Sequence, residues 1–353
     1  ANVPWGMVQL GPTSIPQEWD WTSGYHISDS TVIGFSHMHL SGTGIGDLFD
    51  ITLMPVTGEV TYARGNEKDP QSGLWSYSNR SKEVVKPGYY ATHLLRYGVD
   101  VELTATKRVG FHKYTFNQPE NAAVVFDLQN GGCWDSPTKA YIAKTGEKTI
   151  EGYRYSSGWA NDQRVFFVAE FSQPIASMDV MVDRGDAVAD KGEGKIVYAR
   201  VNVDAKEPVY VKVALSPTSI ENAKMNLQTE LPGWDFEGTV AQADQAWEKA
   251  LAKIDMESPS DKTKTIFYTA LYHTLIHPSI LNDVNGEYPL MENEGVGKVE
   301  DGENIYTVFS LWDTYRNLHQ LLTLVYPERQ RDMVRSMVSM YREWGWMPKW
   351  ELF

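Results

Sequence analysis

The chain has 353 residues, of which 42% are hydrophobic and 22% charged, the composition of an ordinary globular protein with room for about two domains. Its 46 acidic and 32 basic residues give a net charge of −14, which argues against binding to nucleic acid or to an anionic membrane surface. The sequence has no apolar run of about 18 residues, so none that would span a bilayer.

Cys133 is the one cysteine of the sequence, so internal disulfides and thiolate metal clusters are excluded. No activating neighbour is obvious beside it, and a structural thiol is therefore a more common outcome than a nucleophile.

The first 50 residues are irregular and rich in Gly, Ser, Thr and His. His37 and His39 lie two residues apart on an extended segment, where both side chains would point the same way and can ligate a metal. Buried, hydrogen-bonded histidines are more common, and no third ligand is evident nearby. Long polar loops with glycine hinges are nevertheless places where functional sites tend to lie.

From about 51 to 216, short segments rich in Val, Tyr, Phe and Thr predict one strand after another. These segments are 51–56, 89–97, 101–109, 113–116, 123–128, 165–171, 195–203 and 209–215. Regular spacing without intervening helices favours antiparallel sheets stacked as a sandwich, with a scaffold role by default. Trp159 lies in a predicted loop of this region and either packs locally or covers an adjacent site.

The pattern changes near residue 235. Thr239 and Gln242 have the spacing of a capping box, which predicts a helix start, and Ser260 precedes a second helical pattern. Two further helices are predicted at about 310–326 and 328–344. We therefore expect a sandwich domain at 1–235, a linker helix at 236–260 and a helical domain at 261–353, with ligands favoured in the cleft between domains.

The final stretch, from Phe309 onwards, concentrates aromatic and charged residues. Trp312 lies next to Asp313 and near Arg316, and the chain closes with Lys349, Trp350 and Glu351. Tryptophan faces beside charged groups suit a sugar ring, which offers apolar C–H faces and hydroxyls. Asp313 and Arg316, three apart on a predicted helix, either contact a ligand or form a local ion pair. Lys349 and Glu351 either hold hydroxyls or lie on a solvated loop.

Four motifs carry a resemblance to a known family. They occupy residues 23–26, 34–44, 309–316 and 348–352. The chain resembles, over essentially its whole length, glycoside hydrolase family 92, the calcium-dependent exo-acting α-mannosidases of bacteria. The resemblance implies an antiparallel β-sandwich followed by the start of an (α/α)6 barrel, in agreement with the change of pattern near residue 235.

The resemblance also implies a function. Such enzymes remove terminal α-linked mannose with inversion, here from α-1,2 or related N-glycan linkages of an oligosaccharide or glycoprotein glycan. Trp312 and Asp313 match family positions that hold mannose in the −1 subsite, and Trp21 matches an aromatic residue from the sandwich. Arg316, Lys349, Trp350 and Glu351 are further expected substrate contacts. Calcium is the implied cofactor, with ligands unknown, and the implied location is secreted, periplasmic or cell-surface.

The same resemblance places the general acid, the general base and most of the calcium environment in later barrel segments. We therefore expect the catalytic residues downstream of Phe353, in a longer enzyme, and no turnover by these 353 residues alone. Two alternatives stay open: a non-catalytic carbohydrate-binding protein, and an (α/α)6 disaccharide phosphorylase.

Overall fold

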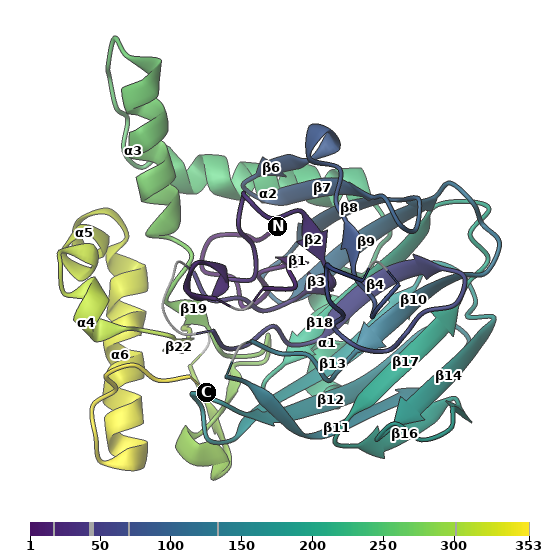
Figure 1. Ribbon diagram of the computed structural model, residues 1–353. Coiled ribbons are helices and arrows are strands. Elements are labelled where there is room, and N and C mark those ends of the chain that lie inside the picture. Colours follow the sequence, from purple (N-terminus) through teal and green to yellow (C-terminus); the bar gives the residue numbers. More distant parts are fainter. Residues whose placement is uncertain (17, 42–45, 70, 133, 301, 353) are drawn as a thin grey trace.

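The computed structural model describes residues 1–353 except 17, 42–45, 70, 133, 301 and 353, so the expectation for Cys133 lies outside the described residues. Figure 1 shows two large sheets packed together, with helices along one edge and at one end of them.

Both large sheets are antiparallel. The smaller sheet has the order β1 (Gly11–Thr13), β3 (Gly34–Ser36), β4 (Thr52–Thr57), β10 (Ala122–Asp127), β17 (Val197–Asn202), β14 (Ser177–Val182), β15 (Val188–Ala189). The larger sheet has the order β16 (Lys191–Gly194), β11 (Ser136–Lys144), β12 (Thr149–Ser157), β13 (Gln163–Phe171), β18 (Val209–Ser216), β9 (Val109–Phe116), β8 (Val99–Ala105), β7 (Tyr89–Leu94), β6 (Val84–Lys86).

The core lies between the two sheets. Phe126 of β10 and Phe167 of β13 stack across it with ring centroids 6.0 Å apart, and both side chains are fully buried. Each such side chain contributes about 1.5–3 kcal/mol through the apolar surface that it removes from water. The predicted antiparallel sandwich, followed by a helical segment, is confirmed.

Two local predictions in the sandwich were wrong. The segment 101–109 is not one strand, because the chain turns between β8 and β9, where the Thr106 amide donates to the Val109 carbonyl. The strands β11 and β12 were missed, because residues such as Lys139, Glu151 and Arg154 interrupt their apolar pattern.

Three short two-stranded pairs and three 3-10 turns complete the non-helical structure of the described chain. The pairs join β2 (Thr31–Val32) to β5 (Ser76–Tyr77), β19 (Ser279–Ile280) to β22 (Tyr306–Thr307), and β20 (Glu287–Pro289) to β21 (Val296–Lys298). The turns are η1 (Trp19–Trp21), η2 (Arg80–Lys82) and η3 (Met291–Asn293).

The first two helices pack on the larger sheet. α1 (Ile220–Glu230) buries Leu227 against the face of that sheet that points away from the core. α2 (Phe236–Leu251) lies beside β7 and β8 and buries Trp247. The predicted capping box was wrong: α2 begins three residues before Thr239, and the Asp235 carboxylate caps it by accepting from the Gly238 amide at 2.9 Å.

α3 (Asp261–His273) stands away from the sandwich (Figure 1). Its predicted start is confirmed, because Ser260 caps the helix through a hydrogen bond from the Thr263 amide. Leu271 is buried, whereas Ile266 on the predicted apolar side is 60% exposed.

The predicted helix at 310–326 is interrupted. α4 (Leu311–Thr314) and α5 (Leu318–Val325) are separated by Asn317, whose φ of 73° is left-handed and incompatible with a continuous helix. Arg316 therefore lies between helices, and it does not share a helical face with Asp313. α6 (Pro327–Trp344) follows directly, with Pro327 in its first turn and Gly345 at its end.

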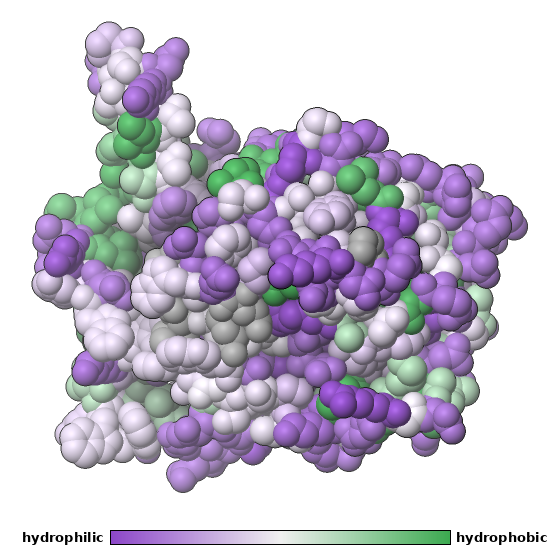
Figure 2. Space-filling view, in the orientation of Figure 1, coloured by the Kyte–Doolittle hydropathy of each residue, from purple (hydrophilic) through white to green (hydrophobic). Residues whose placement is uncertain are grey.

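Apolar side chains gather at the surface over α3 and α5 (Figure 2), and Leu324 of α5 is 83% exposed. None of the helices in the described part of the chain has the length and apolar character needed to cross a bilayer. The domain boundaries at residues 235 and 260 stay predictions.

Candidate functional site

The structure brings α4 and the final segment of the chain together. The Leu311 amide donates to the Lys349 carbonyl at 2.9 Å, which joins two segments that are 38 residues apart. The Lys349 ammonium nitrogen lies 5.3 Å from the ring centroid of Trp312, within the range of a cation–π interaction. Trp312 is 53% exposed, so a large aromatic surface and a cation are presented to solvent together.

Asp313 lies on the same short helix as Trp312 and is exposed. The Ser310 hydroxyl donates to its carboxylate and so fixes its orientation. Arg316 instead contacts Tyr315, whose hydroxyl accepts from Nε at 3.1 Å. Among the described residues no ion pair joins Asp313 to Arg316, so the carboxylate of Asp313 is not neutralised by its neighbour.

Trp350 connects this segment to the sandwich. Its carbonyl accepts a hydrogen bond from the Trp159 indole at 2.9 Å, and the two rings meet edge to face with centroids 4.6 Å apart. Trp159 comes from the loop between β12 and β13, and Trp134 from the loop between β10 and β11 lies beside it. The loop tryptophan noted in the sequence therefore borders the predicted site.

Glu351 points into the interior. Its Oε1 accepts from the Phe309 amide at 3.1 Å and lies 3.5 Å from the Thr307 hydroxyl, while Oε2 is buried without a partner among the described residues. Burial raises the pKa of this carboxyl to about 7, against the lowering effect of its backbone hydrogen bonds. Glu351 thus anchors the final segment beneath the surface that carries Lys349.

Trp21 belongs to η1, in the long N-terminal loop region. Its indole donates to the Asp29 carboxylate at 3.2 Å, and its ring lies 4.7 Å from that of His26. These contacts hold Trp21 within its own loop. In the described part of the chain no hydrogen bond or ring contact joins it to Trp312, so its place in a common site stays a prediction.

The two histidines singled out in the sequence are buried structural groups. His37 Nδ1 lies 2.5 Å from the Ile51 carbonyl and its Nε2 lies 2.9 Å from His112, while His39 bonds Gln9 and Thr13. Burial lowers the pKa of both imidazoles to about 4. Their ring nitrogens are occupied by protein partners, which favours the structural alternative over metal ligation.

Calcium requires six to eight oxygen ligands. Over the residues that the structure describes, no group of three or more His, Cys, Asp or Glu side chains can hold a metal ion. The exposed carboxylate of Asp313 is therefore not part of such a group. These residues do not make a calcium site by themselves.

A buried charge network supports the loop of Trp159. Arg154, fully buried, donates to Asp50 at 2.6 Å and to the Asp135 carboxylate. Burial raises the pKa of Asp50 to about 6 despite the nearby guanidinium. Asp47 accepts from the Trp159 amide at 2.5 Å. These residues were not predicted from the sequence. The one sequence feature that pointed to this region was the glycines that precede the two tryptophans, Gly131, Gly132 and Gly158.

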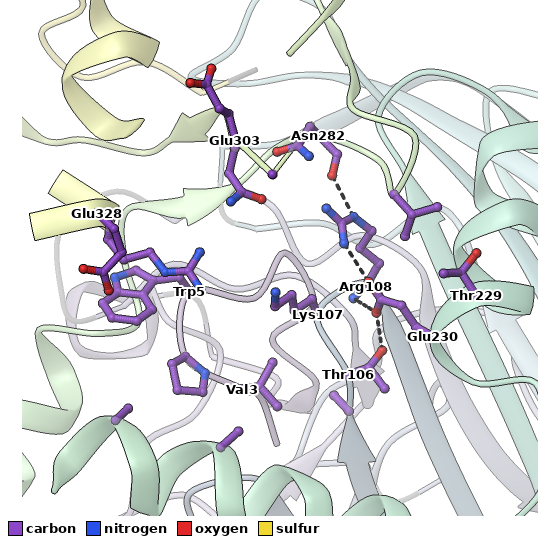
Figure 3. A pocket seen from close by; sticks show the side chains of 18 of the residues that line it. Val3, Trp5, Thr106, Lys107, Arg108, Thr229, Glu230, Asn282, Glu303 and Glu328 are labelled. Atoms are coloured by element: carbon purple, nitrogen blue, oxygen red, sulfur yellow. Dashed lines mark hydrogen bonds and ion pairs between the residues drawn. The ribbon is translucent and has the colours of Figure 1, made fainter. Parts of the chain in front are cut away.

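A cavity of about 960 Å³ lies elsewhere (Figure 3). It is bordered by Trp5, Lys107, Arg108, α2 and the start of α6, and contains none of the seven predicted site residues. Arg108 is paired with Glu230 at 2.6 Å and donates to the Asn282 carbonyl at 2.7 Å. Because that guanidinium is satisfied internally, we place the candidate site at Trp312 and Lys349 instead.

Comparison with known proteins identifies related families and folds. The model of the glycosyl hydrolase family 92 N-terminal domain matches residues 1–216, and that of the family's catalytic domain matches residues 222–353. A curated fungal protein from Arthroderma benhamiae, described as an uncharacterized secreted glycosidase, is 24% identical over 83% of this chain and 41% of its own length.

Solved structures are similar over nearly the whole chain. The family GH92 α-mannosidase BT3965 from Bacteroides thetaiotaomicron is 35% identical over 99% of this chain and 48% of its own, with a TM-score of 0.94. The same protein in complex with mannoimidazole gives a TM-score of 0.93, over 99% of this chain and 47% of its own, at 35% identity. The inverting mannosidase BT2199 of that organism is 25% identical over 99% of this chain and 46% of its own, with a TM-score of 0.86. The chain thus spans about half the length of the relatives that it matches.

Proposed function

Since the chain belongs to glycosyl hydrolase family 92, we propose that it contributes the sandwich side and the mannose-binding surface of an exo-acting, inverting α-mannosidase. One relative of known structure is described as an α-mannosidase, also in complex with mannoimidazole, and another is described as an inverting mannosidase. The fold that this chain shares with them supports the same substrate class.

The observation that carries the proposal is the pairing of Trp312 with Lys349. An exposed indole face offers an apolar surface to the C–H groups of a pyranose, while the ammonium group donates to its hydroxyls. Asp313, oriented by Ser310, is the next residue of α4 and supplies an exposed acceptor. A donor, an acceptor and an aromatic face on adjacent residues can fix both the position and the orientation of one terminal sugar.

The acid and base are assigned outside this chain. An inverting glycosidase uses two carboxyl groups on opposite sides of the scissile bond, about 6.5–9.5 Å apart. Asp313 is exposed, whereas the Glu351 carboxyl is buried and held by Phe309, so the two do not face a common space. We assign the pair to the part of the longer relatives that this chain does not match.

We further propose that the reaction depends on calcium, that α-1,2 or related N-glycan linkages are its substrates, and that the enzyme acts outside the cytoplasm. The description of the fungal relative as secreted supports the last point. Among the described residues, no three or more acidic, histidine or cysteine side chains come together as a metal site, and no step of the proposal passes through the ion.

Proton NMR of incubations with α-1,2-mannobiose tests the proposal. We expect the 353-residue protein to bind the disaccharide without releasing mannose. A protein that also carries the rest of the family's catalytic domain should release β-mannose first and lose activity in EDTA. Release of mannose by the 353 residues alone would contradict the assignment of acid and base. Cleavage that requires phosphate would support the phosphorylase, and binding without turnover by the longer protein would support the non-catalytic alternative.

A further inference from the structure

We propose that Trp134 and Trp159, here named the tryptophan platform, bind the sugar residues that follow the terminal mannose of an oligosaccharide. This inference rests on the proposed function, because it extends the site of Trp312 and Lys349. It adds a second binding surface, contributed by two sandwich loops, to the site formed by α4 and the final segment.

The two rings of the tryptophan platform form an exposed aromatic surface. Trp134 is 57% exposed and Trp159 is 37% exposed. Their centroids are 6.4 Å apart and their planes differ by 26°, so the rings are nearly parallel and offset. Large aromatic side chains that gather at a surface mark a binding site more often than isolated ones do.

Three loops that converge beneath the rings hold the tryptophan platform in place. The Trp134 amide donates to the Gly46 carbonyl at 3.0 Å. Gly132 and Gly158 allow this close approach, because a Cβ at either position would lie 2.5 Å from an atom of Asp47. These glycines are required by packing, and they leave the tryptophans little freedom to move away.

Buried charge fixes the same loops. Arg154 links Asp135, in the loop of Trp134, to Asp50, which lies just before β4. Burial raises the pKa of Asp47, which holds the Trp159 amide. A buried ion pair adds little net stability compared with apolar packing of the same volume. An arrangement that positions two exposed tryptophans in this way is better explained by ligand binding than by core stability.

The tryptophan platform is continuous with the first site. Trp159 donates to the Trp350 carbonyl and packs against the Trp350 ring, and the preceding Lys349 lies over Trp312. An oligosaccharide whose terminal sugar contacts Trp312 can therefore extend across Trp350 towards the sandwich. Figure 1 shows this end of the chain beside the connections of the larger sheet.

The occupant that fits is a neutral pyranose chain. Beneath the platform, Arg154 is paired with Asp50 and Asp135, and the Asp47 carboxylate accepts hydrogen bonds from the backbone amides of Trp159 and Leu48. They are therefore not free to neutralise a charged ligand. The exposed groups are two indoles, which match the C–H faces of successive sugar rings.

Calorimetric titration of the 353-residue protein with two ligands tests the inference: methyl α-mannoside, which reaches one subsite, and an α-1,2-linked mannotetraose. We expect the tetraose to bind more tightly than methyl α-mannoside. Trp134→Ala should weaken tetraose binding about three- to tenfold, the loss of one aromatic contact, and change methyl α-mannoside binding less than about twofold. Trp134 is the better position for this test, because replacing Trp159 would also remove its contact with Trp350.

Two further variants separate binding from structure. Trp159→Phe keeps an aromatic ring and should retain most of the tetraose affinity, whereas Trp159→Ala should not. Trp346→Ala removes a matched, 71% exposed tryptophan that belongs to neither site, and it should leave both affinities unchanged.

The outcomes also distinguish this inference from the proposed function. Three results would overturn the proposed role of the platform. They are equal affinity for the two mannosides, an unchanged tetraose affinity in Trp134→Ala, or an equal loss of tetraose affinity in Trp346→Ala. If methyl α-mannoside binds but the tetraose gains nothing, the proposed function stands and the platform fails. If neither mannoside binds while cellotetraose does, with sensitivity to Trp134→Ala, the platform stands and the mannoside assignment fails.

Discussion

The sandwich and the helical segment differ in how completely they bury their own side chains. The sheets enclose aromatic residues such as Phe126 and Phe167 without exposure, and they even pair a fully buried Arg154. The helical segment leaves Ile266 60% and Leu324 83% exposed. The buried apolar core nevertheless continues from the sheets into the helical segment, where Trp247, Leu322 and Tyr326 belong to the same cluster.

Specific contacts also join the two regions. Trp247 of α2 donates to the Asn2 carbonyl at 2.8 Å, and Trp5 packs edge to face on Tyr326 at 5.0 Å. Trp159 and Trp350 join the sandwich to the final segment. The candidate site lies next to this contact between Trp159 and Trp350, so its geometry requires both regions. Variants of each region should therefore affect it differently.

The largest effect is expected in the sandwich, from Arg154→Met. This change leaves Asp50 and Asp135 buried without their cation, which should lower the free energy of unfolding by about 3–5 kcal/mol in urea denaturation. Arg164→Met is the matched control, because its pair with Asp162 is 38% exposed on both sides and should contribute less than about 1 kcal/mol. Equal losses in the two variants would contradict the role of the buried network.

Two leucines of α5 provide the corresponding test in the helical segment. Leu322 is fully buried and Leu324 is 83% exposed on the same helix. Leu322→Ala should lower the free energy of unfolding by about 2–5 kcal/mol, and Leu324→Ala by less than about 0.5 kcal/mol. Hydrogen exchange should locate the loss in α4–α6 and leave the sheets protected. Faster exchange throughout the sheets would show that the two regions are not separable.

Glu351 should make stability depend on pH. Its folded pKa of about 7 exceeds the ordinary value of 4.5, so the folded state retains a proton that the unfolded state has lost. The free energy of unfolding therefore falls as pH rises from about 4.5 to 7, by roughly 3 kcal/mol from this group. Glu351→Gln cannot ionise and should lack this part of the decline, whereas Glu294→Gln, at an exposed position, should follow the wild type. If the free energy of unfolding depended on pH in the same way in the wild type and in Glu351→Gln, the raised pKa of the buried Glu351 carboxyl would be refuted.

A smaller effect on stability, with a larger one on binding, is expected from Lys349→Met. The side chain is exposed, so unfolding should change by less than about 0.5 kcal/mol. Loss of the ammonium over Trp312 should weaken binding of methyl α-mannoside about tenfold by calorimetry, the value of one charge-assisted hydrogen bond. Lys298→Met, which alters an exposed lysine of β21, serves as the control and should bind like the wild type.

The strands of the sandwich were predicted best where they are strongly apolar, as in β10 and β18. The prediction failed at β12, because Arg154 reads as a solvent-exposed residue until its partners Asp50 and Asp135 are known. Those partners are 104 and 19 residues away in the chain, and no local pattern connects them. The break at Asn317 was equally hidden, because no glycine or proline between residues 310 and 326 marks its left-handed backbone in the sequence.

The candidate site was predictable in part. Clustering of aromatic and charged residues identified Trp312, Asp313, Lys349 and Trp350, since such groups near one another suit a sugar. The contact between Lys349 and Trp312 depends on a backbone hydrogen bond across 38 residues, which no spacing rule foresees. The inward turn of Glu351 was likewise hidden, because it depends on the amide of Phe309.

We propose that this chain binds a terminal mannose on Trp312. Calorimetric titration of the 353-residue protein and of Trp312→Ala with methyl α-mannoside tests it most directly. We predict saturable binding by the wild type, weakened at least about tenfold in Trp312→Ala, and unchanged in Trp346→Ala. Equal binding by the wild type and Trp312→Ala, or no binding by either, would contradict it.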